Sequence, residues 1–383
     1  MAYEGVQVAG RTFQQSSERH LRAIHTATLT PVVRRATDSP TMEISRWNCD
    51  PLQGGIGGGA GGTAIYRFSG EGTDQGKSVR WSLILKILYS RIGESPSDSH
   101  YWRREAEAYQ SGWLSELPLG GLVAPRCFGI EDLDDASWIW LEDVEDESVG
   151  RWSLERYGIA ARHLGQFNGA YLAGTMLPDW TWLSSDWIGQ DLARVVQVIE
   201  WFEGQPAARS WFPTADAVLG LWAKRDYFLQ ALDCLPQTIC HFDAFRRNLF
   251  TRRGLDGQDQ TVAIDWAFTG IGPIGAELVA LVWVSLVFQE ADFAMAHELD
   301  QIVFEGYIAG LRDSGWRGDP KQVRLGYTAA IGLRRITSIG HGLQALNDGD
   351  ETITALMNSI HIVEAGRFVE SLTNEASNLI NTL

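Results

Sequence analysis

Positive charge is scarce in this chain of 383 residues. Lysine and arginine together number 32 against 48 aspartates and glutamates, which gives a formal net charge of −16. Nucleic-acid binding needs a basic surface that displaces counterions from phosphates, so the composition argues against a nucleic-acid partner. The acidity is compatible with a cationic small-molecule ligand, although many acidic proteins bind none.

Cysteine and long apolar runs are also scarce. The longest apolar run, residues 278–288, is interrupted by Ser285 and is too short to span a bilayer, and the N-terminus has no signal-like apolar region. We therefore expect a buried helix at 278–288, no membrane partner and a cytoplasmic location. The cysteines show neither C-x-x-C spacing nor a zinc pattern, which fits a reduced compartment; they are Cys49, Cys127, Cys234 and Cys240.

The remaining composition is that of a folded protein with a large core. Hydrophobic residues make up 45% of the chain and charged residues 21%, which does not indicate disorder. The length allows two lobes. Residues 1–41 mix polar, basic and small side chains around a helix near 17–28, and they predict an N-terminal extension.

The most informative stretch contains the pattern H-x-D-x-x-x-x-N, formed by His241, Asp243 and Asn248. The turn signal Asp256-Gly257 follows, and then a second strand that ends at Asp265. Two strands joined by this turn would bring Asn248 close to Asp265, where an amide and a carboxylate can hold Mg²⁺ while Asp243 accepts a proton from a hydroxyl. A lone His-x-Asp is common by chance, but the asparagine at this offset and the second acid favour a catalytic loop.

A glycine-rich stretch at residues 54–62 precedes a strand-like segment at 63–68. Glycine lets main-chain N–H groups approach an anion closely. A Rossmann turn would open a helix here, whereas 63–68 alternates and is β-branched and aromatic. We therefore expect a hairpin that covers nucleotide phosphates, with a flexible linker as the alternative. The glycines assigned to the phosphates are Gly57, Gly58, Gly59, Gly61 and Gly62.

Lys86 is a single charge inside the apolar strand 79–88. A buried ammonium is costly unless it is paired, so Lys86 predicts an anionic partner such as a nucleotide phosphate or a carboxylate. In the helix that follows, a step of roughly 100° per residue places Glu105 on the apolar face and Glu107 almost opposite. We expect Glu105 to pair with Lys86; the alternative is a surface acid with Lys86 snorkelling.

The pattern H-x-D-x-x-x-x-N followed by I-D-W resembles the motif of the aminoglycoside phosphotransferase and choline kinase branch of the protein-kinase-like fold, where I-D-W stands in place of D-F-G. The resemblance spans about residues 50–290. It implies that Asp243 is the catalytic base and that Asn248 and Asp265 hold Mg²⁺. It further implies that His241 braces the loop and that Arg246 or Arg247 neutralises phosphate charge.

The resemblance also implies the architecture, an α+β bilobal fold. A small N-terminal lobe would contain an antiparallel sheet with one helix, and a larger C-terminal lobe would be mainly helical. We expect an extension over 1–41, a nucleotide-binding lobe over 42–145, and a lobe with the catalytic loop and the acceptor pocket over 146–383. The strand that ends in Leu-Glu-Asp-Val resembles the hinge that meets adenine, and this points to Glu142 and Val144.

One position departs from the family pattern. The family usually has aspartate before a leucine in the loop that leads into the buried helix, and this chain has Glu277 before Leu278. The longer side chain could still brace the catalytic loop.

The predicted activity is the Mg²⁺-dependent transfer of the γ-phosphoryl group of ATP or GTP to a small-molecule hydroxyl, on an aminoglycoside-type antibiotic or related natural product. Residues 180–212 are rich in tryptophan and acids and could hold a cationic or bulky acceptor, although helix packing explains them without a ligand. Kinases of choline-like, sugar or other metabolic alcohols, and a non-catalytic nucleotide-binding scaffold, stay open as alternatives. The oligomeric state is not determined by the sequence.

Overall fold

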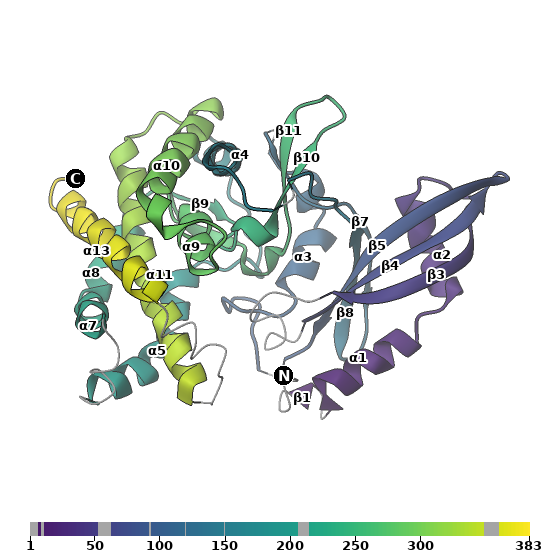
Figure 1. Cartoon of the computed structure of the whole chain (residues 1–383), viewed down its shortest axis with the longest axis horizontal. Helices are drawn as coiled ribbons and strands as arrows, with labels where there is room; N and C mark the ends of the chain where they lie inside the picture. The colour runs from purple at the N-terminus through teal and green to yellow at the C-terminus, as the bar shows by residue number, and fades with distance from the viewer. Residues whose placement is uncertain are drawn as a thin grey trace. The chain divides into compact units, whose positions relative to one another are not determined.

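The structure, a computed structural model, describes residues 7–8, 11–52, 63–91, 93–118, 120–148, 150–205, 214–347 and 360–383 (Figure 1). The chain divides into two compact units. Unit 1 comprises Met1–Pro96, His100–Leu117 and Val123–Glu145, and unit 2 comprises Ser97–Ser99, Pro118–Leu122 and Asp146–Leu383. The glycines expected at the phosphates, within 57–62, lie outside the described residues. In the parts of the chain that are described, no helix has the length and apolarity needed to cross a membrane.

Unit 1 is built on a five-stranded antiparallel sheet in the order β3-β4-β5-β8-β7. β4 follows the glycine-rich stretch directly, which confirms the strand expected at 63–68 and rules out a Rossmann turn there. β4 and β5 form a hairpin closed at Gly76, whose φ of +80° suits glycine. The strands are β3 (Glu43–Leu52), β4 (Thr63–Asp74), β5 (Lys77–Tyr89), β7 (Cys127–Asp132) and β8 (Ala136–Glu142).

Helices cover both faces of this sheet. Because side chains alternate along a strand, Leu83, Leu85 and Ile87 of β5 enter the core shared with α1 (Phe13–Arg22) and α2 (Thr26–Ala36). Lys86 therefore belongs to the opposite face, the face of α3 (Arg104–Gln110).

Residues 13–36 form two helices that belong to unit 1. Where the sequence predicted one helix near 17–28, the structure ends α1 at Arg22 and begins α2 at Thr26. Leu29, Val32 and Val33 are buried in the core of the sheet. The sheet thus carries these two helices besides α3. The short strands β1 (Gln7–Val8) and β2 (Arg11–Thr12) pair just before them.

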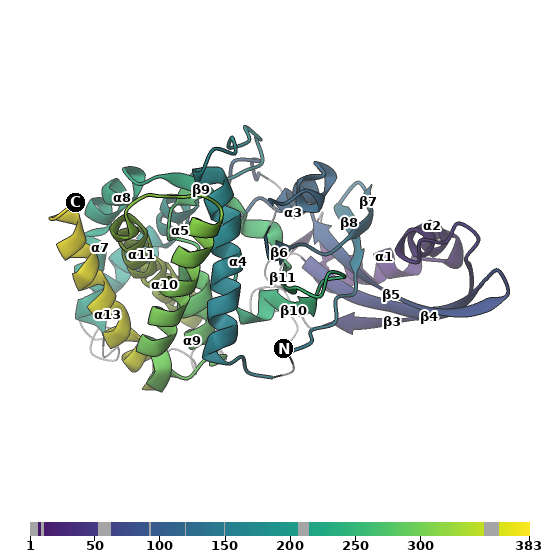
Figure 2. The ribbon, with the colours of Figure 1, turned by 90° about the horizontal axis from the view of Figure 1, so that it is seen from above.

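Unit 2 is mainly helical. α4 (Leu154–Leu172) and α10 (Ala296–Asp313) lie side by side in both views (Figures 1 and 2). Glycines allow this close packing: a Cβ added at Gly165 would lie 2.3 Å from a backbone oxygen of α10, and one at Gly310 would lie 1.9 Å from a backbone oxygen of α4. The other helices are α5 (Trp187–Glu203), α7 (Ala215–Ala223), α8 (Arg225–Asp233), α11 (Pro320–Asn347) and α13 (Ile360–Ile380).

Short strands frame the expected catalytic loop. β9 (Gln237–Cys240) pairs with β12 (Gly270–Pro273), and β10 (Leu249–Arg253) pairs with β11 (Asp259–Ala263), with β6 (Leu122–Val123) beside β11. The run at 278–288 is buried as expected, but it forms a π-helical turn (Ala280–Val284) followed by α9 (Ser285–Val287). Single 3₁₀ turns occupy Trp113–Ser115, Arg246–Asn248, Trp266–Phe268 and Phe293–Met295.

Candidate active site

The loop between β9 and β10 has a fixed backbone course. Phe242 adopts a φ of +63°, a left-handed conformation that is strained for a bulky residue. Its ring stacks on Trp187, with a centroid separation of 5.3 Å and an interplanar angle of 14°. A Cβ on Gly272 would lie 2.3 Å from the Phe242 ring, so only glycine fits there. Packing around Phe242 thus holds a backbone turn that a free chain would avoid.

His241 is fully buried and braces the loop in one tautomer. Its Nδ1 lies 3.2 Å from the backbone N–H of Asp243, which can only donate, so Nδ1 is the acceptor. Its Nε2 therefore carries the proton, and Nε2 donates to the carbonyl of Ile264 at 3.0 Å. One neutral imidazole thus links the loop to the residue that precedes Asp265.

Glu277 binds the same loop from the other side. Its two carboxylate oxygens accept hydrogen bonds from the backbone N–H groups of His241 at 2.6 Å and Phe242 at 3.1 Å. Burial raises the pKa of the Glu277 carboxyl to about 7, and the hydrogen bonds from His241, Phe242 and Asn168 offset only part of that shift. The glutamate that replaces the usual aspartate therefore still braces the loop.

Asn248 links Asp243 to the β10-β11 hairpin. Its Nδ2 donates to the carboxylate of Asp243 at 2.8 Å and to the carbonyl of Asp243 at 3.0 Å. The backbone carbonyl of Asn248 accepts from Ile264 at 2.9 Å, next to the Leu249↔Ala263 pair. The turn expected at Asp256-Gly257 closes this hairpin, and Gly257 has a φ of +75°. Asn248 and Asp265 thus lie at the same end of the hairpin.

These residues suit a hard divalent cation. Because Nδ2 of Asn248 is engaged with Asp243, its Oδ1 is the atom left to bind a metal, and Asp265 adds a half-buried carboxylate. Mg²⁺ commonly takes one or two protein oxygens and completes its shell with phosphates and water. Among the described residues no group of three or more His, Cys, Asp or Glu could hold a metal. The donor set fits a metal that is shared with a nucleotide.

The two arginines of the loop have different surroundings. Arg246 is buried, bonds to the carboxylate of Asp146 at 2.8 Å, donates to three backbone carbonyls and lies over the ring of Trp152. Its positive charge therefore holds the catalytic loop to the segment before α4. Arg247 is 44% exposed and pairs with Glu290 at 2.6 Å. Arg247 is thus the more accessible cation.

In unit 1, Lys86 and Glu105 form a buried ion pair between Nζ and Oε2. Glu107 pairs instead with Arg103, at the start of α3. Each buried charge in the Lys86–Glu105 pair compensates the other, which is the condition for burying either. Glu142 ends β8 and accepts from the backbone N–H of Arg126 at 3.1 Å, and Val144 is buried two residues later.

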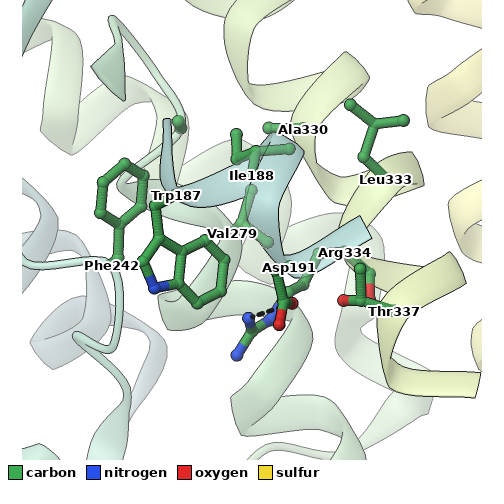
Figure 3. A pocket seen from close by; sticks show the side chains of 10 residues that line it. Trp187, Ile188, Asp191, Phe242, Val279, Ala330, Leu333, Arg334 and Thr337 are labelled. Carbon is green, nitrogen blue, oxygen red and sulfur yellow. Dashed lines mark hydrogen bonds and ion pairs between the residues drawn. The ribbon is translucent and has the colours of Figure 1, made fainter. Parts of the chain in front are cut away.

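Within residues 180–205, the tryptophans do not converge on one site. Trp180 and Trp182 stack on each other, and Trp201 is largely exposed. Trp187 and Asp191 of α5 line a pocket together with Phe242 of the catalytic loop (Figure 3). Trp211 lies outside the described residues.

Sequence reasoning missed one bracing residue, Asn168. This fully buried side chain donates to the carbonyl of Ile239 at 2.6 Å and accepts from the hydroxyl of Tyr307 at 2.7 Å. It thereby fixes β9, the strand that delivers His241. The available signal was an amide among the apolar residues of the helix at 154–173, since a buried amide must find partners.

Comparisons with known proteins agree with this geometry. A model of the phosphotransferase enzyme family matches residues 69–317, well over half of the chain. No curated protein sequence matches the chain. Among solved structures, the chain is similar to a microcompartment-associated aminopropanol kinase, with a TM-score of 0.54, 14% identity, and coverage of 87% of this chain and 95% of that one.

Two further structures have bound nucleotides. An amicoumacin kinase in complex with AMP-PNP and Ca²⁺ has a TM-score of 0.53 and 14% identity, with 81% and 85% of the two chains covered. A spectinomycin phosphotransferase in complex with ADP and spectinomycin has a TM-score of 0.51 and 12% identity, with 93% and 99% covered. At such identities the likeness establishes the fold, which is bilobal and protein-kinase-like.

The fold, the catalytic-loop pattern and the family model agree, and the chain belongs to the phosphotransferase enzyme family, an ATP-dependent family that acts on hydroxyl groups of small molecules.

Proposed function

We propose that this enzyme moves the γ-phosphoryl group of ATP, or of GTP, to a hydroxyl of an aminoglycoside-type antibiotic or related natural product, with Asp243 as the catalytic base. The observation that carries the proposal is the bracing of Asp243: its backbone N–H is bonded to His241 and its carboxylate to Asn248. A carboxylate fixed in this way accepts the proton of the attacking hydroxyl without first reorganising. Phosphoryl transfer depends mainly on such positioning.

The proposed metal ligands are Asn248 and Asp265. A bound Mg²⁺ would neutralise charge on the β- and γ-phosphates. Asn248 would contribute twice, because its Nδ2 donates to Asp243 and its Oδ1 would be available to bind the metal. The left-handed backbone at Asp265, with a φ of +62°, is tolerated by aspartate and asparagine better than by most residues.

Unit 1 is proposed to hold the nucleotide. Lys86, kept in place by Glu105, would orient the phosphates. The main chain at Glu142 and Val144 would contact the purine ring of the nucleotide. The glycines at 57–62 are proposed to cover the phosphates. In this division residues 42–145 bind the nucleotide, and residues 146–383 provide the catalytic loop and the acceptor pocket.

The supporting roles follow from the contacts. His241 is proposed to brace the loop as the neutral tautomer described above. Arg247, with a charge shared with Glu290, is proposed to add a modest favourable potential for the transferring group. Arg246 is proposed to be structural, because its guanidinium is committed to Asp146 and to backbone carbonyls.

The acceptor class has a second candidate. Kinases of antibiotics and an aminopropanol kinase share this fold, so a choline-like, sugar or other metabolic alcohol is the alternative acceptor. A non-catalytic scaffold is less well supported, because a protein that only binds nucleotide has no need of a braced base. A cytoplasmic location is proposed because none of the four cysteines forms a disulfide.

The test is a search for a phosphorylated product by mass spectrometry. A pooled panel of aminoglycosides, macrolides, nucleosides, sugars and amino alcohols is incubated with Mg²⁺, ATP and either wild type or Asp243→Asn. The proposal expects a compound that gains one phosphoryl group only with wild type. Stabilisation by Mg²⁺-ATP without any product would favour the scaffold.

A further inference from the structure

The pocket beside the catalytic loop has a mainly apolar wall. Its cavity is small, about 20 Å³, and is partly open to solvent, and its lining comes from α5, α11, the catalytic loop and the segment around Glu277 (Figure 3). Phe242, one residue from the proposed base, forms one side of it. A group of the acceptor that packs against the mouth of this pocket would therefore lie near the reacting hydroxyl.

The ring of Trp187, the tryptophan of this pocket, is already in contact with a cationic side chain. The guanidinium carbon of Arg334 lies 4.4 Å from the centroid of the Trp187 ring, while Phe242 stacks against the same residue. A ligand ammonium would have to compete with Arg334 for the ring and would meet a like charge beside it. These contacts therefore do not favour Trp187 as the residue through which the tryptophan-rich segment would hold a cationic acceptor.

The acid of the pocket is paired as well. Asp191 is 1% exposed, and its Oδ2 lies 3.3 Å from Nη1 of Arg334. Its Oδ1 also lies 3.8 Å from Nε2 of His341. Asp191 and Arg334 are the charged residues of the lining, and their charges cancel. The pocket thus offers no net negative charge to attract an ammonium group.

The guanidinium of Arg334 has N–H donors that are not used in the described part of the protein. Its side chain is 21% exposed, and within the described ranges its only hydrogen bond is from Nη1 to Asp191, which leaves Nε and Nη2 without a protein acceptor. Nε and Nη2 form one planar edge of the guanidinium, a geometry that matches the two oxygens of a carboxylate. Asp191 and Trp187 hold this edge in place before any ligand arrives.

We propose that Arg334 is a specificity-determining residue that binds a carboxylate of the acceptor through Nε and Nη2. The inference rests on the proposed phosphotransfer, and among its acceptors it favours a natural product that carries a carboxylate next to an apolar group over a polycationic aminoglycoside. Arg334 acts on binding and orientation, and Asp191 and Trp187 position it.

The experiment compares three series of acceptors of equal chain length: hydroxy acids, their primary amides and amino alcohols. Values of kcat and KM with Mg²⁺-ATP are measured for wild type, Arg334→Met and Arg334→Lys. Methionine keeps an apolar stem over Trp187, and lysine keeps the charge without the planar edge. Arg194→Met, an exposed change on the same helix as Asp191, is the matched control. Melting temperature and ATP affinity report on folding.

The expected result is that wild type prefers the hydroxy acids over the amino alcohols. Arg334→Met should lower kcat/KM for the acids by about 10- to 100-fold, mainly through KM, and leave the amino alcohols within about threefold. Arg334→Lys should recover part of the loss, and Arg194→Met should match wild type.

Three results would overturn the inference. Phosphorylation of amino alcohols in preference to acids would reject it and leave the proposed function intact. A preference for acids that persists in Arg334→Met would also reject it. Transfer to no acceptor in these series or in the antibiotic panel would count against both proposals.

Discussion

Two buried glutamates, one in each unit, are stabilised by different means. Glu105 faces the ammonium of Lys86, so a full opposite charge compensates its burial. Glu277 is held by two backbone N–H groups and by Asn168, and its pKa rises to about 7. Hydrogen bonds offset only part of the rise in the Glu277 pKa that burial causes, whereas Glu105 faces a full opposite charge. In unit 1 the buried glutamate therefore holds the ammonium of Lys86, and in unit 2 the buried glutamate holds the backbone of the catalytic loop.

The largest effect on nucleotide binding should come from Asp265, the proposed metal ligand in unit 2. Asp265→Asn keeps a residue that tolerates the left-handed backbone and removes the carboxylate charge. We expect Mg²⁺-dependent affinity for ATP to fall by about 100-fold or more, measured by calorimetric titration with and without Mg²⁺. If the ATP affinity of the variant depends on Mg²⁺ as it does in wild type, Asp265 is not a metal ligand.

Breaking the ion pair of unit 1 should be costly for stability. Glu105→Gln leaves the ammonium of Lys86 buried without its carboxylate, and we expect a loss of about 3–5 kcal/mol in unfolding free energy. The double change Lys86→Met with Glu105→Leu should recover most of that stability but not the ATP affinity. Denaturant unfolding and ATP titration of the three proteins separate the two effects. A double variant that binds ATP like wild type would contradict the role of Lys86.

The variant Glu277→Gln tests whether the buried carboxyl of Glu277 titrates near pH 7. The folded state retains the Glu277 proton up to about pH 7, whereas the unfolded chain releases it near 4.5, so the folded state binds more protons in this window. Wild type therefore loses stability as pH rises through the window, by about 3 kcal/mol in total, and Glu277→Gln lacks this loss. The stability advantage of wild type over the variant should shrink as pH rises.

The measurement is denaturant unfolding of wild type and Glu277→Gln at several pH values, with the exposed Glu298→Gln as control. A difference between wild type and Glu277→Gln that does not change with pH would mean that Glu277 stays ionised when buried.

Arg247 should show the smallest effect. It is partly exposed and its charge is balanced by Glu290, so Arg247→Gln should lower kcat by less than about tenfold. Steady-state kinetics with Arg194→Gln as control measure this. A loss of several hundredfold would instead place Arg247 at the transferring phosphate.

Local signals in the sequence were enough to predict part of the geometry of the candidate site. The spacing of His241, Asp243 and Asn248, the turn at Asp256-Gly257 and the helical face of Glu105 are all patterns within a few residues. The structure places Asn248 at the end of the β10-β11 hairpin and Glu105 against Lys86.

Other parts required the tertiary structure. The roles of Asn168 and Arg334 depend on partners 71 to 143 positions away in the chain, which no local pattern reveals. The sequence indicated an N-terminal extension where α1 and α2 lie, because the apolar faces of these helices are short. Their position against the sheet of unit 1 is evident only from the tertiary structure.

The most direct test of the account is Asp243→Asn, which preserves the shape of the loop and removes the proposed base. Turnover of an acceptor from the panel and affinity for Mg²⁺-ATP are measured on the same preparation. The account predicts that kcat falls by about 10²- to 10⁴-fold while ATP affinity stays the same. Turnover like that of wild type would contradict the assignment of Asp243 and with it the proposed mechanism.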